Sequence, residues 1–303
     1  MLQTESAFPP VPPELLKAKT PLLCVLAGPT AVGKTNVAIQ WARTCKSCVI
    51  SADSRQFYKE MTIGTAKPSL AEMSGIPHYF IGHLSISDYY SVSRFEHDVL
   101  QLLPSLFARA PVVFLAGGSG LYIDAVCKGM DCLPDPDPHI RAVVAKIHEE
   151  EGIESLRARL RVLDPRFYQQ TDIANPKRLI RALEVCLQTG KPYSSQLTAP
   201  KIQRPFTVRK YCLTRSRPNL FDRINQRVEI MMQNGLLHEV KSLLPYRHYN
   251  ALNTVGYKEL FQYIDHEYTL EQAVENIKTH TRHYAKRQLS WIKRDGEYES
   301  IDM

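Results

Sequence analysis

The chain has 303 residues, of which 44% are hydrophobic, and its 38 basic and 31 acidic side chains give a formal net charge of +7. This length and hydrophobic share exclude a disordered chain and allow one large domain or a domain with a sizeable insertion. The positive surplus favours anionic partners, although many ordinary proteins are equally basic.

The amino-terminal segment and the cysteines indicate the compartment. Residues 1–20 form a proline-rich tail without the apolar core of a secretory signal, and no apolar run approaches membrane-spanning length. The seven cysteines are an odd number, and Cys45-x-x-Cys48 has neither a second such pair nor histidines at zinc-finger spacing. We therefore expect reduced, mostly buried cysteines in a cytoplasmic protein without a membrane partner.

The first predicted strand, residues 22–27, leads into a loop spelled G-x-x-x-x-G-K-T, after which a helical pattern begins. This order is the context of a P-loop, in which backbone N–H groups and a helix N-terminus bind an anion. Lys34 adds a positive charge, and the Thr35 hydroxyl is placed to ligate Mg²⁺. The loop predicts a site for a diphosphate or triphosphate, made of Gly28, Pro29, Thr30, Ala31, Val32, Gly33, Lys34 and Thr35.

A second buried strand, residues 47–51, is followed closely by Asp53. Side chains just past the carboxyl ends of parallel strands handle ligands, so we expect Asp53 beside the phosphate loop. It could hold Mg²⁺ through water, act as a general base on a nucleophile, or cap the next turn. The spacing alone does not choose among these three roles.

The third predicted strand, residues 111–116, follows an amphipathic helix over 93–107. P-loop enzymes that hydrolyse ATP or GTP usually place a magnesium-binding aspartate at the end of such a strand. Here the strand ends in Gly117-Gly118-Ser119-Gly120, and we expect the glycines to let a ligand approach the backbone. The missing aspartate argues against an ordinary nucleotide hydrolase.

The composition changes at residues 133–138, a proline-punctuated hinge that we expect to begin a small all-helical insertion over 134–200. A charged helical stretch spans 139–170, and a second helix runs from Asn175 to Gly190. Its apolar positions predict one buried face: Leu179, Ile180, Leu183, Cys186 and Leu187. Cations at a helix N-terminus oppose the helix dipole, so its first turns indicate an anion-binding role for Lys177, Arg178 and Arg181.

The remainder returns to the core, with a last strand over 209–213 and a helix from Leu220, on which Arg223 and Arg227 share a face. That pair could clamp a phosphate, although the spacing alone favours a solvated face. The terminal helix has an apolar side and a broad basic side, which fits an RNA backbone. Its basic side carries Arg282, Lys286, Arg287, Lys293 and Arg294.

Together these motifs resemble the tRNA dimethylallyltransferases, also called isopentenyl-tRNA or IPP transferases, over roughly residues 21–294. Ser119 stands where the family usually has threonine, and Lys177 where glutamine is common. The resemblance rests on an ordered series: GPTAxGKT at 28–35, DSxQ at 53–56, IGTAKP at 63–68, GGxGLY at 117–122, KRxxRALEV at 177–185, VGYKE at 255–259 and YAKRQxxW at 284–291.

The resemblance implies an α/β fold, in which a P-loop core of parallel strands flanked by helices spans 21–133 and 201–303. It implies transfer of a dimethylallyl group from dimethylallyl diphosphate to N6 of adenosine 37, next to the anticodon of tRNA, with Mg²⁺ as the cofactor. Asp53 would take the proton from the amine, and Ser119 would help to hold the base. The leaving diphosphate would be stabilised by Lys34, Thr35 and Arg223.

The resemblance and the basic segments together imply contacts with the tRNA anticodon stem-loop. These contacts are assigned to Asp53, Ser54, Arg55, Gln56, Ser119, Lys177, Arg178, Leu179, Ile180, Arg181, Arg282, Lys286 and Arg287.

Three alternative functions stay open at this point. An adenylate isopentenyltransferase acting on free AMP, ADP or ATP would keep the P-loop and Asp53 but need no contacts with tRNA. A small-molecule or nucleoside kinase would use ATP, and a non-enzymatic RNA-binding module would leave the P-loop unexplained. Since one chain carries every part, we expect a monomer without an obligate protein partner.

Overall fold

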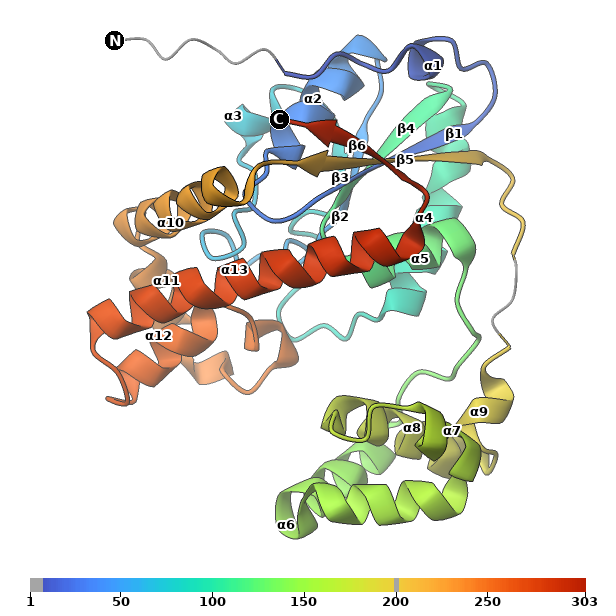
Figure 1. Cartoon of the computed structure of the whole chain (residues 1–303), viewed down its shortest axis with the longest axis vertical. Coiled ribbons are helices and arrows are strands. Elements are labelled where there is room, and N and C mark those ends of the chain that lie inside the picture. The colour runs from blue at the N-terminus through green and yellow to red at the C-terminus, as the bar shows by residue number, and fades with distance from the viewer. Residues whose placement is uncertain (1–7, 199–201) are drawn as a thin grey trace. The chain divides into compact units, whose positions relative to one another are not determined.

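The computed structural model describes residues 8–198 and 202–303, which fall into two compact units (Figure 1). The first unit comprises Met1–Cys127 and Arg204–Met303, and the second comprises Lys128–Gln203. The second unit contains the segment predicted as the insertion. Residues 1–7 of the predicted tail and the predicted boundary at 200 and 201 lie outside the described residues.

A six-stranded sheet with the order β3-β2-β4-β1-β5-β6 forms the centre of the first unit (Figure 1). Every neighbouring pair of strands is parallel, which confirms the predicted α/β class. The sequence did not predict β6, because its half-buried and exposed residues form no apolar run. The strands are β1 (Leu22–Ala27), β2 (Val49–Ala52), β3 (His78–Tyr79), β4 (Val112–Gly117), β5 (Thr207–Thr214) and β6 (Tyr298–Asp302).

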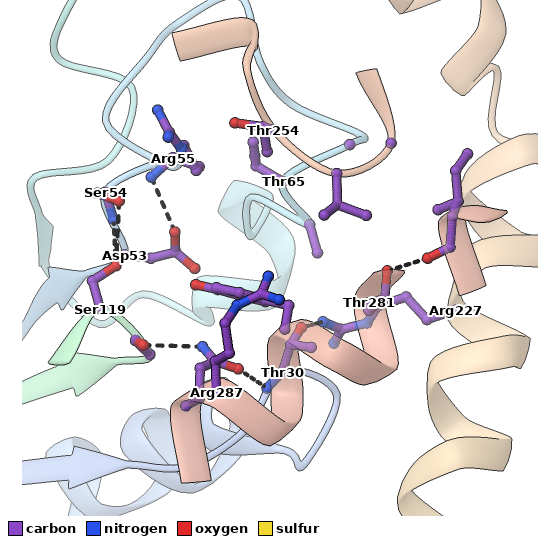
Figure 2. Close-up of a pocket in the computed structure, with 18 of the residues that line it drawn as sticks. Thr30, Asp53, Ser54, Arg55, Thr65, Ser119, Arg227, Thr254, Thr281 and Arg287 are labelled. Atoms are coloured by element: carbon purple, nitrogen blue, oxygen red, sulfur yellow. Dashed lines mark hydrogen bonds between the residues drawn. The ribbon is translucent and has the colours of Figure 1, made fainter. Parts of the chain in front are cut away.

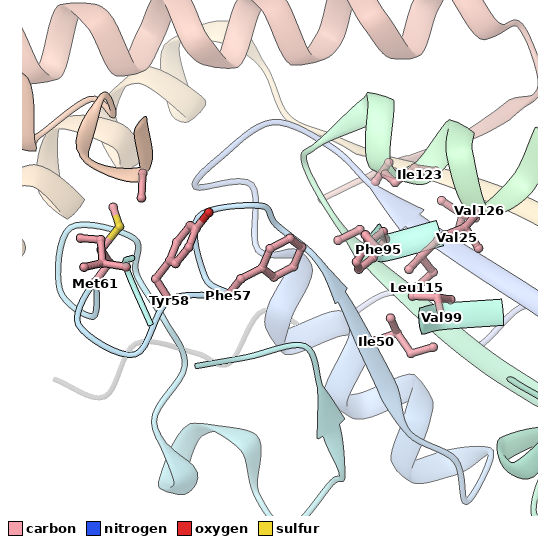
Figure 3. Packing of buried hydrophobic residues seen from close by; sticks show 14 of the residues in the cluster. Val25, Ile50, Phe57, Tyr58, Met61, Phe95, Val99, Leu115, Ile123 and Val126 are labelled. Carbon is pink, nitrogen blue, oxygen red and sulfur yellow. The ribbon is translucent and has the colours of Figure 1, made fainter. Parts of the chain in front are cut away.

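Alternate side chains of β1 enter two hydrophobic clusters, as the period of a strand buried on both faces requires. Val25 belongs to the cluster drawn in Figure 3, together with Leu115 of the neighbouring β4, Ile50 of β2 and Phe95 of α4. The helices of this unit are α1 (Pro13–Leu16), α2 (Lys34–Thr44), α3 (Leu70–Met73), α4 (Val92–Phe107), α5 (Gly120–Lys128), α10 (Arg217–Gln233), α11 (Leu236–Ser242), α12 (Tyr257–Ile264) and α13 (Leu270–Asp295), with 3₁₀ turns η1 (Leu244–Tyr246) and η2 (Asn250–Leu252).

The described part of the predicted tail packs on this unit. Leu15 of α1 is buried in the second cluster. The indole Nε1 of Trp41 donates to the Pro9 carbonyl over 2.8 Å, and the Tyr211 hydroxyl donates to the Glu14 carboxylate. Residues 9–15 therefore cover one side of the core instead of forming a separate tail.

Every element that the structure describes in the second unit is a helix, as predicted, and the unit has its own small core. Its long first helix is interrupted at Gly152, where φ is 75°. Leu156, Leu160 and Leu183 are buried at its centre. Leu187 was predicted on the buried face of α8 but is 48% exposed. The helices are α6 (Pro138–Leu163), α7 (Pro165–Gln170), α8 (Pro176–Thr189) and α9 (Tyr193–Gln196).

All seven cysteines lie among the described residues, and none of them forms a disulfide. Five are buried, and Cys132 is exposed. Among the described helices, none is both long and apolar enough to cross a membrane.

Candidate active site

The P-loop joins β1 to α2 and folds around the side chain of Lys34. The Nζ of Lys34 donates to the carbonyl oxygens of Gly28 and Pro29 over 2.9 and 2.8 Å. Burial lowers the pKa of Lys34 to about 8, against the attraction of the nearby Asp53 carboxylate. Gly33 has a φ of 114°, which a side chain rarely tolerates, so the glycine before the lysine is required by the turn.

Two arginines of α10 reach the P-loop. The Nε of Arg223 donates to the Ala31 carbonyl over 2.8 Å, and Nη1 of Arg227 reaches the Thr30 hydroxyl at 3.4 Å. Burial lowers the pKa of Arg227, and the charge of Arg223 lowers it further. Of these two arginines, the sequence analysis assigned only Arg223 to the diphosphate site. The spacing of four residues was the signal for the second arginine, but it did not show which face α10 turns toward the loop.

A cavity of about 480 Å³ opens beside the P-loop at the carboxyl ends of the strands (Figure 2). Thr30 and Arg227 contribute to its wall, and so do Asp53 and Ser54 from the end of β2. The backbone N–H of Ser54 donates to the Ser119 hydroxyl over 3.1 Å, which ties the end of β2 to that of β4. The cavity therefore brings Thr30 of the predicted diphosphate site and the predicted base Asp53 to one place, and the other predicted diphosphate-site residues do not line it.

The Asp53 carboxylate contacts the turn that follows it, where its Oδ1 accepts from the backbone N–H of Arg55 over 3.0 Å. This turn contact is the structural role that the sequence left open. The carboxylate also lines the cavity and interacts electrostatically with Lys34 and Arg227. Burial and the charge of Asp53 raise the pKa of Tyr284, so that this phenol on the cavity wall stays neutral. A carboxylate held between cations and a neutral phenol can accept a proton from a bound amine.

Helix α13, near the C-terminus of the sequence, forms one wall of the site. Gln288 is buried, and its Oε1 accepts from the Thr30 N–H over 2.8 Å while its Nε2 donates to the Gly118 carbonyl over 3.0 Å. A Cβ on Gly118 would lie 2.0 Å from Gln288, and one on Gly120 would lie 2.2 Å from Trp291. The room that these glycines leave is taken by side chains of α13, and both glycines also line the cavity, so the expectation that a ligand approaches their backbone stays a prediction.

Gln56 and Arg55 follow Asp53 and were predicted to contact tRNA. The amide of Gln56 donates to the carbonyls of Thr65 and Ala66 and accepts from the Ser51 hydroxyl. Its hydrogen bonds thus hold the neighbouring loop. Arg55 lines the cavity and reaches the Asn250 carbonyl at 3.4 Å.

The basic side of α13 is only partly open to solvent. Arg282 donates to Asn225 over 2.7 Å and lies over the Phe221 ring, so this arginine stabilises the contact between α13 and α10. Lys286 and Arg287 are exposed. Arg287 lines both the site cavity and a second, more polar hollow of about 980 Å³, whose other cations and imidazoles are Arg247, Lys258, His248, His280 and His283.

In the second unit, the structure separates the basic residues of α8 from their apolar neighbours. Leu179 is 0% exposed, so its side chain cannot contact tRNA, and that assignment is wrong. Ile180 packs against the same core. Arg181 donates to the Pro134 carbonyl over 2.7 Å and lies 3.5 Å from the buried carboxylate of Glu184. Lys177 and Arg178 are exposed at the start of the helix.

Comparison with known proteins decides the family. A family model described as IPP transferase matches residues 56–295. The chain belongs to the IPP transferase family.

Members of the IPP transferase family resemble the chain over most of its length. It is 50% identical to tRNA dimethylallyltransferase 1 of Bacteroides thetaiotaomicron over 277 residues, which are 91% of this chain and 90% of that protein. The crystal structure of the tRNA isopentenylpyrophosphate transferase from Bacillus halodurans is 34% identical, with a TM-score of 0.68, and the match covers 94% of this chain and 90% of that one. A eukaryotic dimethylallyltransferase acting on tRNA is 28% identical, with a TM-score of 0.76, and the match covers 93% of this chain and 74% of that one.

Proposed function

We propose that this chain transfers the dimethylallyl group of dimethylallyl diphosphate to N6 of adenosine 37, beside the anticodon of tRNA. The observation that carries the proposal is the shared cavity, which is lined by Asp53 and Arg227 together with Thr30 of the P-loop. The activity and the tRNA substrate are those in the names of the relatives, and family membership supports their transfer to this chain.

The donor end of the site is cationic. Breaking the allylic C–O bond leaves negative charge on the diphosphate, which must be stabilised as the bond breaks. The Lys34 ammonium lies within the P-loop against the Gly28 carbonyl, and the Arg227 guanidinium reaches Thr30 of the same loop. The backbone amides of the loop supply further hydrogen bonds. Arg223 contributes by holding the Ala31 carbonyl, and its charge adds to the field at the loop.

The residues at the start of α2 fit the Mg²⁺ ion that diphosphate chemistry commonly uses. Thr35 has an exposed hydroxyl on the first turn of this helix, directly after Lys34. Mg²⁺ keeps several waters and takes only one or two protein oxygens when phosphates complete its shell, so a dedicated cage of carboxylates is not needed. When bound, the ion neutralises charge that develops on the diphosphate.

The acceptor end of the site holds Asp53. As the N6–carbon bond forms and the allylic C–O bond breaks, the amine nitrogen becomes acidic and must lose a proton. The Asp53 carboxylate accepts this proton, and the diphosphate leaves with the electrons of the broken bond. Ser54 and Ser119 line the same cavity with their hydroxyls 3.3 Å apart, and we assign these hydroxyls to hydrogen-bond the base.

The substrate adenosine must leave its stacked anticodon loop to enter this cavity. Flipping a base costs a few kcal/mol, which contacts with the rest of the RNA offset. The exposed cations that support such contacts are Lys177 and Arg178 in the second unit and Lys286 and Arg287 on α13.

The decisive experiment incubates the protein, Mg²⁺ and dimethylallyl diphosphate with unmodified tRNA or with AMP, followed by mass analysis of the nucleosides. We expect a prenyl adduct on the tRNA adenosine alone, and a loss of at least about 100-fold in rate for Asp53→Ala. An adduct on AMP would instead identify an adenylate isopentenyltransferase, and transfer of phosphate from ATP would identify a kinase.

Asp222→Ala is the matched control for the loss of the Asp53 carboxylate. Asp222 is an exposed aspartate of α10 outside the cavity wall, so we expect its replacement to leave the transfer rate within twofold of the native value. Equal loss in both variants would remove Asp53 as the base.

A further inference from the structure

Glu239, on α11, accepts three backbone hydrogen bonds from the loop over residues 62–66. Its Oε2 accepts from the backbone N–H groups of Thr62 and Ile63 over 3.0 and 2.7 Å. Its Oε1 accepts from the N–H of Gly64 over 3.0 Å and from the hydroxyl of Tyr257 over 2.6 Å. One carboxylate, distant in sequence, therefore fixes three consecutive amides of this loop.

Other polar groups of the loop also have partners within the protein. The Thr65 hydroxyl donates to the Met61 carbonyl over 2.8 Å. The Nε2 amide of Gln56 donates hydrogen bonds to the carbonyls of Thr65 and Ala66. These hydrogen bonds fix Gly64, Thr65 and Ala66 where they line the cavity.

The same carboxylate positions a second part of the cavity wall. Tyr257 is fully buried at the start of α12, and its ring lies so close to the loop that a Cβ on Gly64 would be 2.6 Å from it. The preceding residue, Gly256, lines the cavity, and its N–H donates to Glu259 over 2.7 Å. Glu239 thus joins the loop over 62–66 to the start of α12.

These two walls lie on the acceptor side of the site. In Figure 2, Thr65 of the loop and Thr254 near α12 are drawn on the side of Asp53 that faces away from Thr30 of the P-loop. Among the described residues, the four hydrogen bonds of the Glu239 carboxylate go to the loop over 62–66 and to Tyr257, and none goes to the P-loop. A wall with three backbone amides and a hydroxyl already engaged within the protein suits the face of a nucleobase, which stacks without hydrogen bonds.

We propose that Glu239 is a positioning residue for the acceptor adenine, acting through the loop over 62–66 and through Tyr257. The proposal rests on the proposed function, because it assigns the base and not the diphosphate to this side of the cavity. Glu239 touches neither substrate. Its four hydrogen bonds hold the wall at the spacing that admits a planar ring beside Asp53.

The test is a steady-state comparison of native protein and Glu239→Gln, with tRNA and dimethylallyl diphosphate varied in turn. The glutamine amide keeps the size of the side chain, but it presents N–H groups to donors and loses the charge. We expect kcat/KM for tRNA to fall about tenfold or more, while KM for dimethylallyl diphosphate stays within twofold. A merely structural role would lower thermal stability without separating the two substrates.

Two further variants keep the test informative if Glu239→Gln folds poorly. Tyr257→Phe keeps the buried ring and removes one of the four hydrogen bonds, and we expect the same separation of substrates with a smaller loss. Glu239→Asp keeps the charge, and we expect it to recover part of the activity with tRNA. Glu299→Gln, an exposed glutamate of β6, is the matched control.

Two results would overturn the proposal. In one, Glu239→Gln and Tyr257→Phe retain kcat/KM for tRNA within twofold. In the other, KM for dimethylallyl diphosphate rises as much as KM for tRNA, which would place the donor against this wall. Neither result affects the proposed transfer reaction, because the native protein is assayed in the same experiment.

Discussion

Lys34 shows how a single side chain is prepared for an anion. Its ammonium is held by two carbonyls of its own loop, and burial lowers its pKa to about 8 because few water molecules solvate the charge. A bound diphosphate supplies the opposite charge that this burial lacks. Binding should therefore favour the protonated lysine and raise its pKa.

This linkage predicts that affinity for dimethylallyl diphosphate depends on pH. Below a pH of about 8 the ammonium is already charged, whereas above it each binding event must first take up a proton. We expect the Kd to rise by up to about tenfold per pH unit above that value. Isothermal titration calorimetry between pH 6.5 and 9.5 (roughly three units around the pKa) measures it.

Lys34→Arg provides the control for the ionisation of the ligand, which acts equally on both proteins. A guanidinium stays charged over this range, so the Kd of the variant should change much less above pH 8. Equal pH dependence in both proteins would show that Lys34 is not the titrating group.

The residues of the site differ in how far the sequence could predict them. The P-loop is a contiguous sequence motif, and Asp53 directly follows an apolar strand. Both are local signals that a sequence shows without a structure. Arg227, Glu239 and Gln288 bind elements far away in the chain, and no local pattern shows which face a helix turns toward its neighbours. Periodicity correctly predicted that Leu179 is buried, and this burial excludes the tRNA contact that the family motif suggested.

At the scale of elements, α13 joins several parts of the core by hydrogen bonds and also presents a basic surface. Gln288 bridges the P-loop and the end of β4, and the Nε1 of Trp291 donates to Asp124 of α5 over 2.8 Å. The glycines after β4 make room for these side chains. The sequence predicted the helix and its two sides, but glycines alone cannot show whether a ligand or a side chain fills the space that they leave.

We expect Gln288→Leu to destabilise the protein and to weaken donor binding. The leucine leaves the Thr30 N–H and the Gly118 carbonyl without their partner in a buried region, which costs about 1–3 kcal/mol of unfolding free energy. Urea denaturation followed by circular dichroism measures the loss, and calorimetry measures the affinity for dimethylallyl diphosphate.

Gln101→Leu is the matched control, because Gln101 is exposed on α4 and no hydrogen bond is given for its side chain in the described part of the chain. We expect its stability to stay within about 0.5 kcal/mol of the native value. Equal stability of the two variants would contradict the prediction that Gln288 stabilises the protein by joining the P-loop to the end of β4.

At the scale of the whole molecule, positive charge is distributed over both compact units. The net charge of +7 includes exposed cations on α8 of the second unit and on α13 of the first. Not every cation of the predicted patches is available to RNA, since Arg181 is held by the Pro134 carbonyl and lies beside Glu184. Charge reversal at Arg181 would place two carboxylates together at a buried site, so it would perturb folding as well as binding.

Lys177 and Arg178 therefore offer the cleaner test of the second unit. Each cation that neutralises an RNA phosphate releases counterions, so the logarithm of affinity falls with the logarithm of salt concentration in proportion to the number of contacts. We expect Lys177→Ala with Arg178→Ala to weaken tRNA binding and to reduce the magnitude of that slope by about two, roughly one for each contact. Filter binding of tRNA over a series of salt concentrations measures both quantities, and affinity for dimethylallyl diphosphate should not change.

The matched control removes the same charge elsewhere in the second unit, by Arg161→Ala with Arg166→Ala, both exposed cations. We expect this control to leave the salt slope close to the native value, because the proposal places phosphates at α8. If both double variants reduce the slope equally, the second unit attracts RNA by its total charge, and α8 carries no specific contact. If neither does, the phosphate contacts belong to the first unit alone, where Lys286 and Arg287 become the residues to replace.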